Sequence, residues 1–364
     1  MFDLFGGKQI EIVKTDKMYV EITSKCNLHC VHCYNDSGAD KDTYMSMAVF
    51  ERIISYVQDT DYKNIAISGG EPLLHPSFYE FVDLCRANKV SYTIVSNGTL
   101  INEHFIEYFA DDPMLEGIQI SVEGGSAAIH DLVRGEGTFL KLAQKLVLLR
   151  DNNLIDKTSL KMTLTRLNYQ HMKEACDFAV SLGVHQISFG WLNYAGRGAV
   201  NQDSLSLTQE IVAEVLQCSK YIEGKRGSTL CSGVGVAHIC ALSRFSPQMI
   251  LSPRITPEGD VYPCSMFENN QFFTLGNLTE SSLYDVLNSE RTKALLYVFI
   301  LRKDLLLKCQ TCSVRSTCGK GCVARAYLTA NTIFANDDFC DFNKMTILQS
   351  YRNVYKRKVD AHDG

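Results

Sequence analysis

Three cysteines stand close together near the start of the chain, directly after an apolar segment. Cys26, Cys30 and Cys33 have the spacing C-x3-C-x2-C and follow residues 18–22. Structural zinc sites close a tetrahedron with four ligands, whereas iron–sulfur clusters are held by thiolates. Three thiolates on one short loop would hold three irons of a [4Fe–4S] cluster and leave the fourth iron open. The loop therefore favours a reactive cluster over the alternatives, a zinc site or a chance grouping.

This loop resembles the cluster loop of the radical S-adenosylmethionine (SAM) enzymes, in which the amino and carboxylate groups of SAM chelate the open iron. The resemblance implies that Cys26, Cys30 and Cys33 hold a [4Fe–4S] cluster and that SAM is the second cofactor. His32 stands where the family often has an aromatic residue against the adenine. His32 could stack there, or His32 and Tyr34 could simply pack the loop.

The composition is that of an ordinary globular protein. With 364 residues, 46% apolar and 21% charged, the chain is long enough for more than one domain and is neither disordered nor fibrous. The net charge is −5 and no basic tract indicates a nucleic-acid partner. No apolar run approaches the roughly 18 to 20 residues that span a bilayer, so we expect a cytoplasmic protein without a membrane partner. In a reducing compartment, 14 cysteines are better explained by metal binding than by disulfides.

Up to about residue 200, short β-rich runs alternate with amphipathic helical stretches. The expected strands are residues 18–23, 64–68, 91–96, 117–122, 159–165 and 185–189. The expected helices are residues 48–58, 76–88, 103–110, 139–152 and 169–182. Six strands alternating with helices predict an α/β fold with a parallel sheet. The radical SAM resemblance implies that this sheet is a partial (β/α)6 TIM-like barrel, two units short of a complete one.

Polar and glycine residues follow the predicted strands, where the reactive groups of such barrels lie. Gly69, Gly70 and Glu71 follow the second strand and resemble the family's GGE motif. In that motif glycine lets the backbone approach the ligand, and carbonyl or carboxylate oxygens receive the SAM ammonium. An ordinary turn would use the same residue types. Asn97, after the third strand, is a further candidate for SAM binding.

The fourth strand leads to three more candidates. Ser121 and Glu123 match the family's polar positions near the ribose and carboxylate of SAM. Arg134 resembles an arginine whose guanidinium fork clamps that carboxylate. The alternative for Glu123 and Arg134 is a solvated surface charge. Four other residues are expected at the mouth of the barrel, where capping or turn roles would explain them equally well: Thr165, Arg166, Asn193 and Arg197.

After about residue 200 the alternation stops and the cysteine density rises. A linking helix is expected at 205–223, which gives a barrel at 1–200, a linker at 201–230, a cysteine-rich domain at 231–345 and a tail at 346–364. The pattern G-x4-C, then C-x2-C-x5-C-x3-C, then a last cysteine resembles the SPASM domain of many radical SAM enzymes. That domain carries two auxiliary [4Fe–4S] clusters, so the resemblance implies three clusters in all.

The SPASM resemblance implies two ligand sets. The first auxiliary cluster would take Cys231, Cys240, Cys264 and Cys322. The second would take Cys309, Cys312, Cys318 and Cys340. Cys322 would cross to the other cluster, as one cysteine does in two-cluster ferredoxins. The spacer of 18 residues between Cys240 and Gly259 is longer than usual; without Cys231 or Cys240 the first cluster would have an open iron.

Two points about these cysteines are open. A pair of zinc knuckles is the alternative for the C-terminal cysteines. Three further cysteines fall within helical patterns, where free cysteine behaves as a small buried hydrophobe, and we expect no chemistry from them: Cys85, Cys176 and Cys218.

The resemblance also implies a reaction. The reduced cluster cleaves SAM to a 5′-deoxyadenosyl radical, which removes a hydrogen atom from the substrate. SPASM enzymes act largely on peptides, so we expect an oxidoreductase that modifies a peptide, through a thioether or carbon–carbon cross-link or a related C–H functionalisation. Ser265 follows Cys264 where sulfatase maturases usually have an acidic residue, which argues against that activity. No hydrogen donor or general base can be named.

The expected partners are a peptide substrate and an electron donor such as flavodoxin or ferredoxin. The first strand begins near Met18, which leaves no room before it for a leader-binding domain, so peptide recognition would need a separate protein or be absent. Two other functions are open. One is a radical SAM enzyme acting on a small molecule or tetrapyrrole, and the other is a non-catalytic iron–sulfur or zinc protein that senses metal or redox state.

Overall fold

In a computed structural model of the chain, the structure describes residues 17–60, 64–226, 231–232, 251–267, 270–318, 321–348 and 351. These residues fall into two compact units. The barrel unit comprises the described residues up to 232 together with 252–286, and the C-terminal unit comprises residue 251 and the described residues from 287 onward. The four segments expected from the sequence, 1–200, 201–230, 231–345 and 346–364, stay a prediction. In the described part of the chain, no helix combines the length and apolarity needed to cross a membrane.

The six expected strands lie side by side in chain order, and all of them run parallel. They are β1 (Met18–Glu21), β2 (Asn64–Ser68), β3 (Ser91–Ser96), β4 (Leu115–Ser121), β5 (Thr158–Leu164) and β6 (Gln186–Trp191). The expectation of a partial parallel barrel is therefore confirmed.

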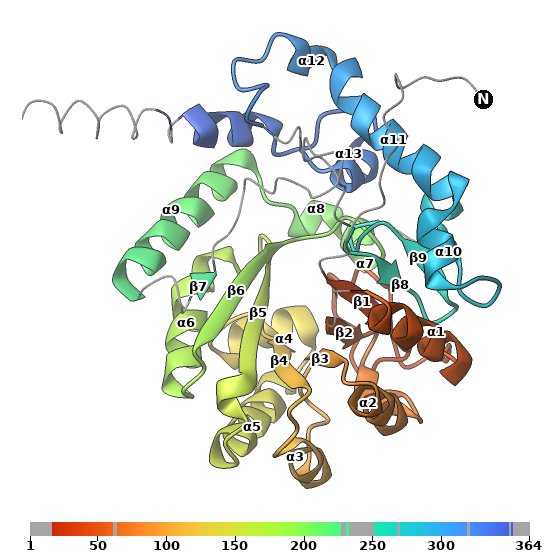
Figure 1. The fold of residues 1–364 in the computed structure, drawn as a ribbon. Helices are drawn as coiled ribbons and strands as arrows, with labels where there is room; N and C mark the ends of the chain where they lie inside the picture. Colours follow the sequence, from red (N-terminus) through yellow and green to blue (C-terminus); the bar gives the residue numbers. More distant parts are fainter. Residues whose placement is uncertain are drawn as a thin grey trace, which may run out of the picture. The chain divides into compact units, whose positions relative to one another are not determined.

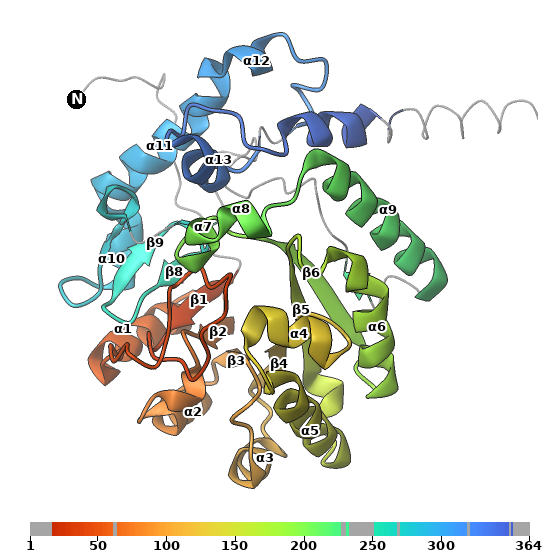
Figure 2. The same cartoon turned by 180° about the vertical axis from the view of Figure 1, so that it is seen from behind.

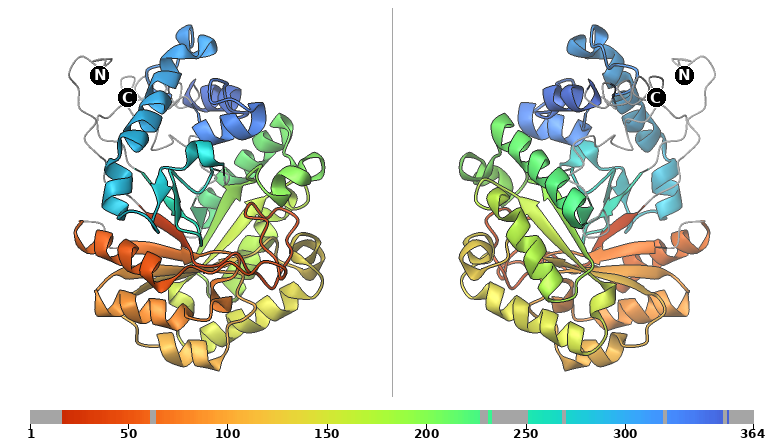
Figure 3. Two further views of the ribbon diagram at one scale, coloured as in Figure 1. Left: turned by 90° about the vertical axis from the view of Figure 1, so that its right-hand side faces the viewer. Right: turned by 90° about the vertical axis from the view of Figure 1, so that its left-hand side faces the viewer.

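Helices connect these strands and lie along the outside of the sheet (Figures 1, 2 and 3). They are α1 (Met47–Gln58), α2 (Phe78–Ala87), α3 (Glu103–Phe109), α4 (Ala127–Arg134), α5 (Thr138–Asp151) and α6 (Met172–Ser181). In α1, Val49, Ile53 and Val57 recur at helical spacing and are buried, so the helix packs an apolar stripe against the sheet. α1 begins where the Ser46 side chain accepts a hydrogen bond from the Val49 N–H at 3.3 Å.

After β6 the barrel unit continues with α7 (Arg197–Val200), α8 (Gln202–Leu205) and α9 (Gln209–Arg226), the last of which is the expected linking helix. The C-terminal unit contains α11 (Glu290–Leu305), α12 (Leu307–Gln310) and α13 (Val323–Ala330). α10 (Leu283–Asn288) spans the boundary between the two units. Short 3-10 turns occupy Pro72–Leu74, Ile155–Lys157, Tyr169–His171 and Gln271–Phe273.

Four very short strands, which the sequence does not predict, extend the sheet at both edges. β7 (Cys231–Ser232) pairs parallel with β6, and β8 (Arg254–Ile255) pairs parallel with β1. β9 (Asp260–Tyr262) and β10 (Gly276–Asn277) continue antiparallel from β8, which gives the order 10-9-8-1-2-3-4-5-6-7. Strands of two or three residues are too short to show a period-two pattern. Part of the cysteine-rich region thus belongs to the barrel sheet.

A buried ion pair joins the returning strand β8 to β1. Arg254 donates from Nε and Nη2 to the two carboxylate oxygens of Glu21, each at 2.8 Å, and both side chains are 2% exposed. Arg254 also donates to Asn35 Oδ1 at 2.8 Å and to the Phe267 carbonyl at 3.1 Å. The Tyr34 hydroxyl donates to Glu21 at 2.8 Å. Buried charges are tolerated when they are paired and fully hydrogen-bonded, and here the pair ties the end of the cysteine loop to β8.

Candidate active site

A cavity of about 300 Å³ opens at the C-terminal ends of the strands of the barrel unit. Cys26, Cys30 and Cys33 line it from the loop that follows β1. Six of the residues that the sequence associates with SAM also line it: His32, Gly69, Gly70, Asn97, Ser121 and Arg134. Glu71 and Glu123 do not line it; both carboxylates are fully buried beside it.

The sheet presents polar side chains to this cavity. On β4, Gln119 and Ser121 line the cavity, whereas the alternate residues Ile118 and Ile120 are buried on the other face. β5 repeats the pattern, with Lys161 and Thr163 lining the cavity and Leu160, Met162 and Leu164 buried. The interior of a (β/α)8 barrel is normally packed with branched apolar residues. A polar, open interior is instead suited to a ligand.

The cysteine loop is built for metal ligation. The Cys26 and Cys30 side chains are buried and Cys33 is partly exposed. Burial raises the pKa of Cys26 to about 12 and also raises the pKa of Cys30. Thiols in such surroundings stay protonated until a metal displaces the proton, which is how thiolate ligation couples to metal binding.

Arg197 at the start of α7 holds the loop in place. It donates from Nε to the Cys30 carbonyl at 2.8 Å, from Nη1 to Asp36 Oδ1 at 2.7 Å and from Nη2 to the Ser37 carbonyl at 2.7 Å. Gly196 has a φ of 51°, and a Cβ there would lie 2.6 Å from the Tyr34 carbonyl oxygen. The segment after β6 therefore positions the cysteines across the barrel.

The other three residues expected at the mouth have different surroundings. Thr165 is bonded to Asn168 within its own turn, and Arg166 donates to the Ser206 carbonyl at 3.1 Å, as the turn alternative expects. Asn193 lines the cavity, and its Oδ1 is buried without a hydrogen-bond partner among the described residues. His32 also lines the cavity, and its Nδ1 is likewise buried without a hydrogen-bond partner among the described residues. These two atoms suit a ligand that, like SAM, carries hydrogen-bonding groups.

The two glycines after β2 allow a close approach of two backbone segments. The Gly70 N–H donates to the Thr23 carbonyl at 2.7 Å, and the Glu71 N–H donates to the Lys25 carbonyl at 2.8 Å. A Cβ on Gly69 would lie 2.4 Å from the Thr23 oxygen, and one on Gly70 would lie 2.2 Å from the Lys25 oxygen. The motif thus fastens the end of β2 to the segment that enters the cysteine loop, and its contact with SAM stays a prediction.

Replacing Gly70 with alanine is expected to destabilise the protein by about 1–3 kcal/mol, because the new methyl group has no room against the Lys25 carbonyl. Chemical denaturation under anaerobic conditions measures this loss. Gly117→Ala is the matched control, since its Cβ would make only an ordinary contact of 3.4 Å. Equal stability of the two variants would contradict the role of Gly70.

Glu71 ties the ends of β2 and β3 together. Its carboxylate accepts hydrogen bonds from the Ser96 hydroxyl and the Asn97 N–H, both at 2.8 Å, and from the Leu73 N–H at 3.3 Å. Burial raises the pKa of Glu71 to about 7, although these hydrogen bonds oppose the shift. Asn97 in turn points its Nδ2 toward Cys26 Sγ at 3.9 Å. Asn97 therefore connects Glu71 to the cysteine loop.

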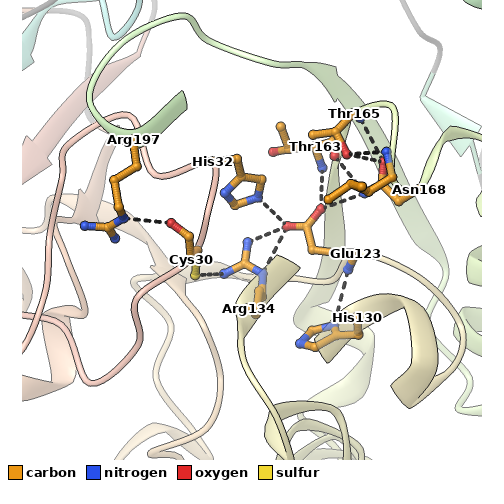
Figure 4. Close-up of polar contacts among 10 residues, drawn as sticks. Cys30, His32, Glu123, His130, Arg134, Thr163, Thr165, Asn168 and Arg197 are labelled. Atoms are coloured by element: carbon orange, nitrogen blue, oxygen red, sulfur yellow. Dashed lines mark hydrogen bonds and ion pairs between the residues drawn. The ribbon is translucent and has the colours of Figure 1, made fainter. Parts of the chain in front are cut away.

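Glu123 is the centre of a buried polar network (Figure 4). It accepts hydrogen bonds from His32 Nε2 at 2.9 Å and from Arg134 Nη2 at 2.6 Å. On its other oxygen it accepts from the Thr163 N–H and from Asn168 Nδ2, both at 3.2 Å. Burial alone would raise the pKa of this carboxylate, but the charges and hydrogen bonds of His32 and Arg134 outweigh it and hold the pKa at about 2.

Arg134, the last residue of α4, links this network to the cysteine loop. Its Nη1 lies 3.7 Å from Cys30 Sγ, and its side chain is only 10% exposed (Figure 4). Glu123 and Arg134 are therefore not solvated surface charges. Their arrangement places a fixed positive charge beside a predicted cluster ligand.

A second cavity, of about 150 Å³, lies within the C-terminal unit. Its lining includes Cys309, Cys312, Cys318 and Cys340, the four cysteines implied for the second auxiliary cluster. Burial raises the pKa of Cys340 to about 11. Cys322 does not line this cavity, which is compatible with its assignment to the other cluster.

The first auxiliary set is described only in part. Cys240 lies outside the described residues, and Cys231 contributes the backbone of β7. Cys264 follows β9 in the barrel unit, and the next two residues, Ser265 and Met266, line the first cavity. Among the described residues, no three His, Cys, Asp or Glu side chains form a group that could hold a single metal ion. A cubane cluster spaces its thiolates more widely than a single ion does.

The remaining cysteines match the expectation of a packing role in part. Cys85 in α2 and Cys176 in α6 are completely buried, whereas Cys218 in α9 is partly exposed. Several cavity residues were not singled out from the sequence: Gln119, Lys161, Thr163, Trp191 and Met266. Gln119, Lys161 and Thr163 could have been found from the sequence, because polar and apolar residues alternate along β4 and β5. Such alternation is unusual in a parallel sheet that is covered on both faces.

Two parts of the chain match known families. Residues 20–179 match the Radical SAM superfamily, and residues 250–313 match SPASM, an iron–sulfur cluster-binding domain. The chain is 26% identical to the mycofactocin maturase MftC of Mycobacterium ulcerans, over 88% of this chain and 86% of that protein. It is 25% identical to AlbA, a subtilosin biosynthesis protein of Bacillus subtilis, over 74% of this chain and 58% of that protein.

A solved structure shares the fold. Streptococcus suis SuiB bound to S-adenosylmethionine superposes with a TM-score of 0.72 at 16% identity, covering 90% of this chain and 77% of SuiB. The parallel sheet, the cysteine loop at its C-terminal edge and the sequence matches lead to one conclusion. The chain carries a radical SAM superfamily domain at residues 20–179 and a SPASM iron–sulfur cluster-binding domain at residues 250–313.

Proposed function

We propose that this protein is an enzyme that modifies a peptide by an oxidative, radical-based reaction, such as a thioether or carbon–carbon cross-link. The observation that carries the proposal is the polar cavity lined by three cysteines at the C-terminal edge of the sheet. The relatives of this chain include a mycofactocin maturase and a protein of bacteriocin biosynthesis, and both names support a ribosomally made peptide as the substrate.

Cys26, Cys30 and Cys33 would hold the catalytic [4Fe–4S] cluster, and the unpaired polar atoms of His32 and Asn193 would contact SAM. When bound, these cofactors supply a 5′-deoxyadenosyl radical that removes a hydrogen atom from the substrate. The chain's own contribution is placement. Arg197 and the glycines after β2 fix the loop, and the walls of the cavity keep one C–H bond of the substrate near the radical and exclude water.

The two auxiliary clusters belong to the same proposal. Cys309, Cys312, Cys318 and Cys340 would hold one of them in the cavity of the C-terminal unit. Cys264 and Cys322, with Cys231 and Cys240, would hold the other. Such clusters can accept the electron that an oxidative cross-link releases. The electron for SAM cleavage would come from flavodoxin or ferredoxin. If the chain does not itself recognise the peptide, a separate protein would bind the peptide and present it to the cavity.

The test is to co-express the enzyme with small peptides encoded beside its gene and to record intact masses. We expect one peptide to become lighter by two hydrogen atoms for each cross-link, because the cross-link removes one hydrogen from each partner atom. The same peptide must keep its mass when Cys26, Cys30 and Cys33 are replaced by alanine. Unchanged masses of every candidate, with a protein that still cleaves SAM, would contradict a peptide substrate.

A further inference from the structure

Lys161 is a cation in the cavity whose side chain forms no ion pair with any of the described carboxylates. It lies on β5, directly across from Ser121 on β4, and its side chain lines the cavity. A Cβ on the neighbouring Gly190 would come within 3.0 Å of Lys161 Cε and 3.1 Å of Nζ. The absence of a side chain at Gly190 therefore gives the lysine room to lie across β6.

The other cations of the cavity are already paired. Arg134 is bound to Glu123, and Arg197 to Asp36 and two carbonyls. The Lys161 side chain has no hydrogen bond or ion pair with any described residue, and the oxygens of Glu123 are occupied by other donors. No described aspartate or glutamate lines the cavity. Burial lowers the pKa of Lys161, and the nearby charge of Glu123 only partly offsets that effect.

SAM would not satisfy this charge. SAM brings a sulfonium and an ammonium but only one carboxylate, and the family resemblance assigns that carboxylate to the open iron of the cluster. A partly buried ammonium without a counter-ion is unfavourable, and a carboxylate that accepts its hydrogen bonds would remove the cost. The missing anion is therefore expected to arrive with the substrate.

We infer that Lys161 binds a carboxylate of the substrate, from an acidic side chain or the C-terminus of the peptide, and so selects which part of the peptide enters the cavity. This inference rests on the proposed function, since it specifies the substrate of the same site. Ser121 and Thr163, which flank Lys161 on the cavity wall, supply hydroxyl groups for the same carboxylate.

The probes for this site are N-acetyl-L-glutamate and its uncharged counterpart N-acetyl-L-glutamine. Their binding to the oxidised, cluster-loaded protein with SAM present is measured by saturation-transfer NMR, so no turnover is needed. We expect the glutamate probe to bind roughly tenfold more tightly than the glutamine probe, as one charge-assisted hydrogen bond allows. Lys161→Met should abolish this preference and Lys161→Arg should retain most of it.

Lys141→Met is the matched control, because Lys141 is exposed on α5, and it should keep the preference. Equal binding of the two probes to the unaltered protein, or a preference that survives in Lys161→Met, would overturn the inference. The affinity for SAM is measured in the same samples. If Lys161→Met weakens SAM binding by as much as it weakens binding of the glutamate probe, the carboxylate belongs to SAM and the inference fails. Failure of the unaltered protein to cleave SAM, measured separately, would instead defeat the proposed function.

Discussion

Replacing Cys26, Cys30 and Cys33 together by alanine is expected to lower the iron content of anaerobically purified protein from about twelve to about eight atoms per chain, because one of three [4Fe–4S] clusters is lost. Reductive cleavage of SAM should disappear in the same variant. Iron and sulfide are counted by colorimetric assay, and 5′-deoxyadenosine by chromatography. The remaining irons should stay, since the cavity of Cys309, Cys312, Cys318 and Cys340 is built by residues of the C-terminal unit.

Cys218→Ala controls for the loss of a thiol that has no part in either cavity. It should retain all of the iron and all of the SAM cleavage. If the unaltered protein holds about four irons and the triple variant none, the protein has the SAM-cleaving cluster but no auxiliary clusters. Zinc in their place would leave the C-terminal cysteines a structural role, and the argument for an oxidative reaction would lose its electron acceptor.

Removing the carboxylate of Glu123 is expected to destabilise the barrel unit strongly. Glu123→Ala would leave the Arg134 guanidinium buried without its partner and would strand the donors of His32 and Asn168. Breaking a buried ion pair from one side costs about 3–5 kcal/mol. Urea denaturation at neutral pH, under anaerobic conditions, measures the change.

The pH dependence of this contribution has a definite sign. Glu123 has its pKa lowered from 4.5 to about 2 in the folded protein, so the folded state binds its proton less readily than the unfolded state does. Its stabilisation is therefore complete above the unfolded pKa and is lost only as the pH falls toward the folded one. The stability difference between the unaltered protein and Glu123→Gln should stay constant from about pH 5 to pH 8. A difference that varies by more than about 1 kcal/mol over that range would mean that a group of this network titrates there.

Glu174→Gln is the control for losing an acidic partner of histidine at the surface. The Glu174 carboxylate pairs with His171 at 2.8 Å, but both side chains are at least one-third exposed. Such exposed pairs contribute about 0–1 kcal/mol. A loss of stability in Glu174→Gln as large as that in Glu123→Ala would show that the buried network has no special role.

The parts of this protein that follow a simple repeat could be predicted from the sequence. Strands β1 to β6 were located to within three residues at their ends, because each is long enough to show β-rich character between helical patterns. β8 could not be found in this way. It is two residues long and is defined by its pairing with β1, where Arg254 lies across from Tyr19 and binds Glu21, 233 positions away in the chain. Only the folded chain brings those residues together.

The same distinction between local patterns and long-range contacts applies to the candidate site. The cysteines, the glycines after β2 and Arg134 were found because motif spacing is a local property of the sequence. The motif did not predict that Glu71 bonds to Ser96 rather than facing the cavity, or that Arg197 holds the carbonyl of Cys30. Those contacts cross between separate strands of the barrel. Lys161 was visible only as an alternate residue in a strand, and its significance depends on which neighbours are already paired.

The position of β8 in the sequence also determines when this strand can pair with β1 during synthesis. Strand β1 leaves the ribosome early, but the arginine that neutralises its buried Glu21 follows 233 residues later. At translation rates of about 5–20 residues per second, that interval is on the order of ten to fifty seconds. Throughout it, the nascent barrel has an open edge and an acidic residue without its counter-charge. The addition of β8 to this edge, and with it the pairing of Arg254 with Glu21 beside Tyr34, therefore follows the synthesis of all six main strands. Cluster insertion is best timed to follow it.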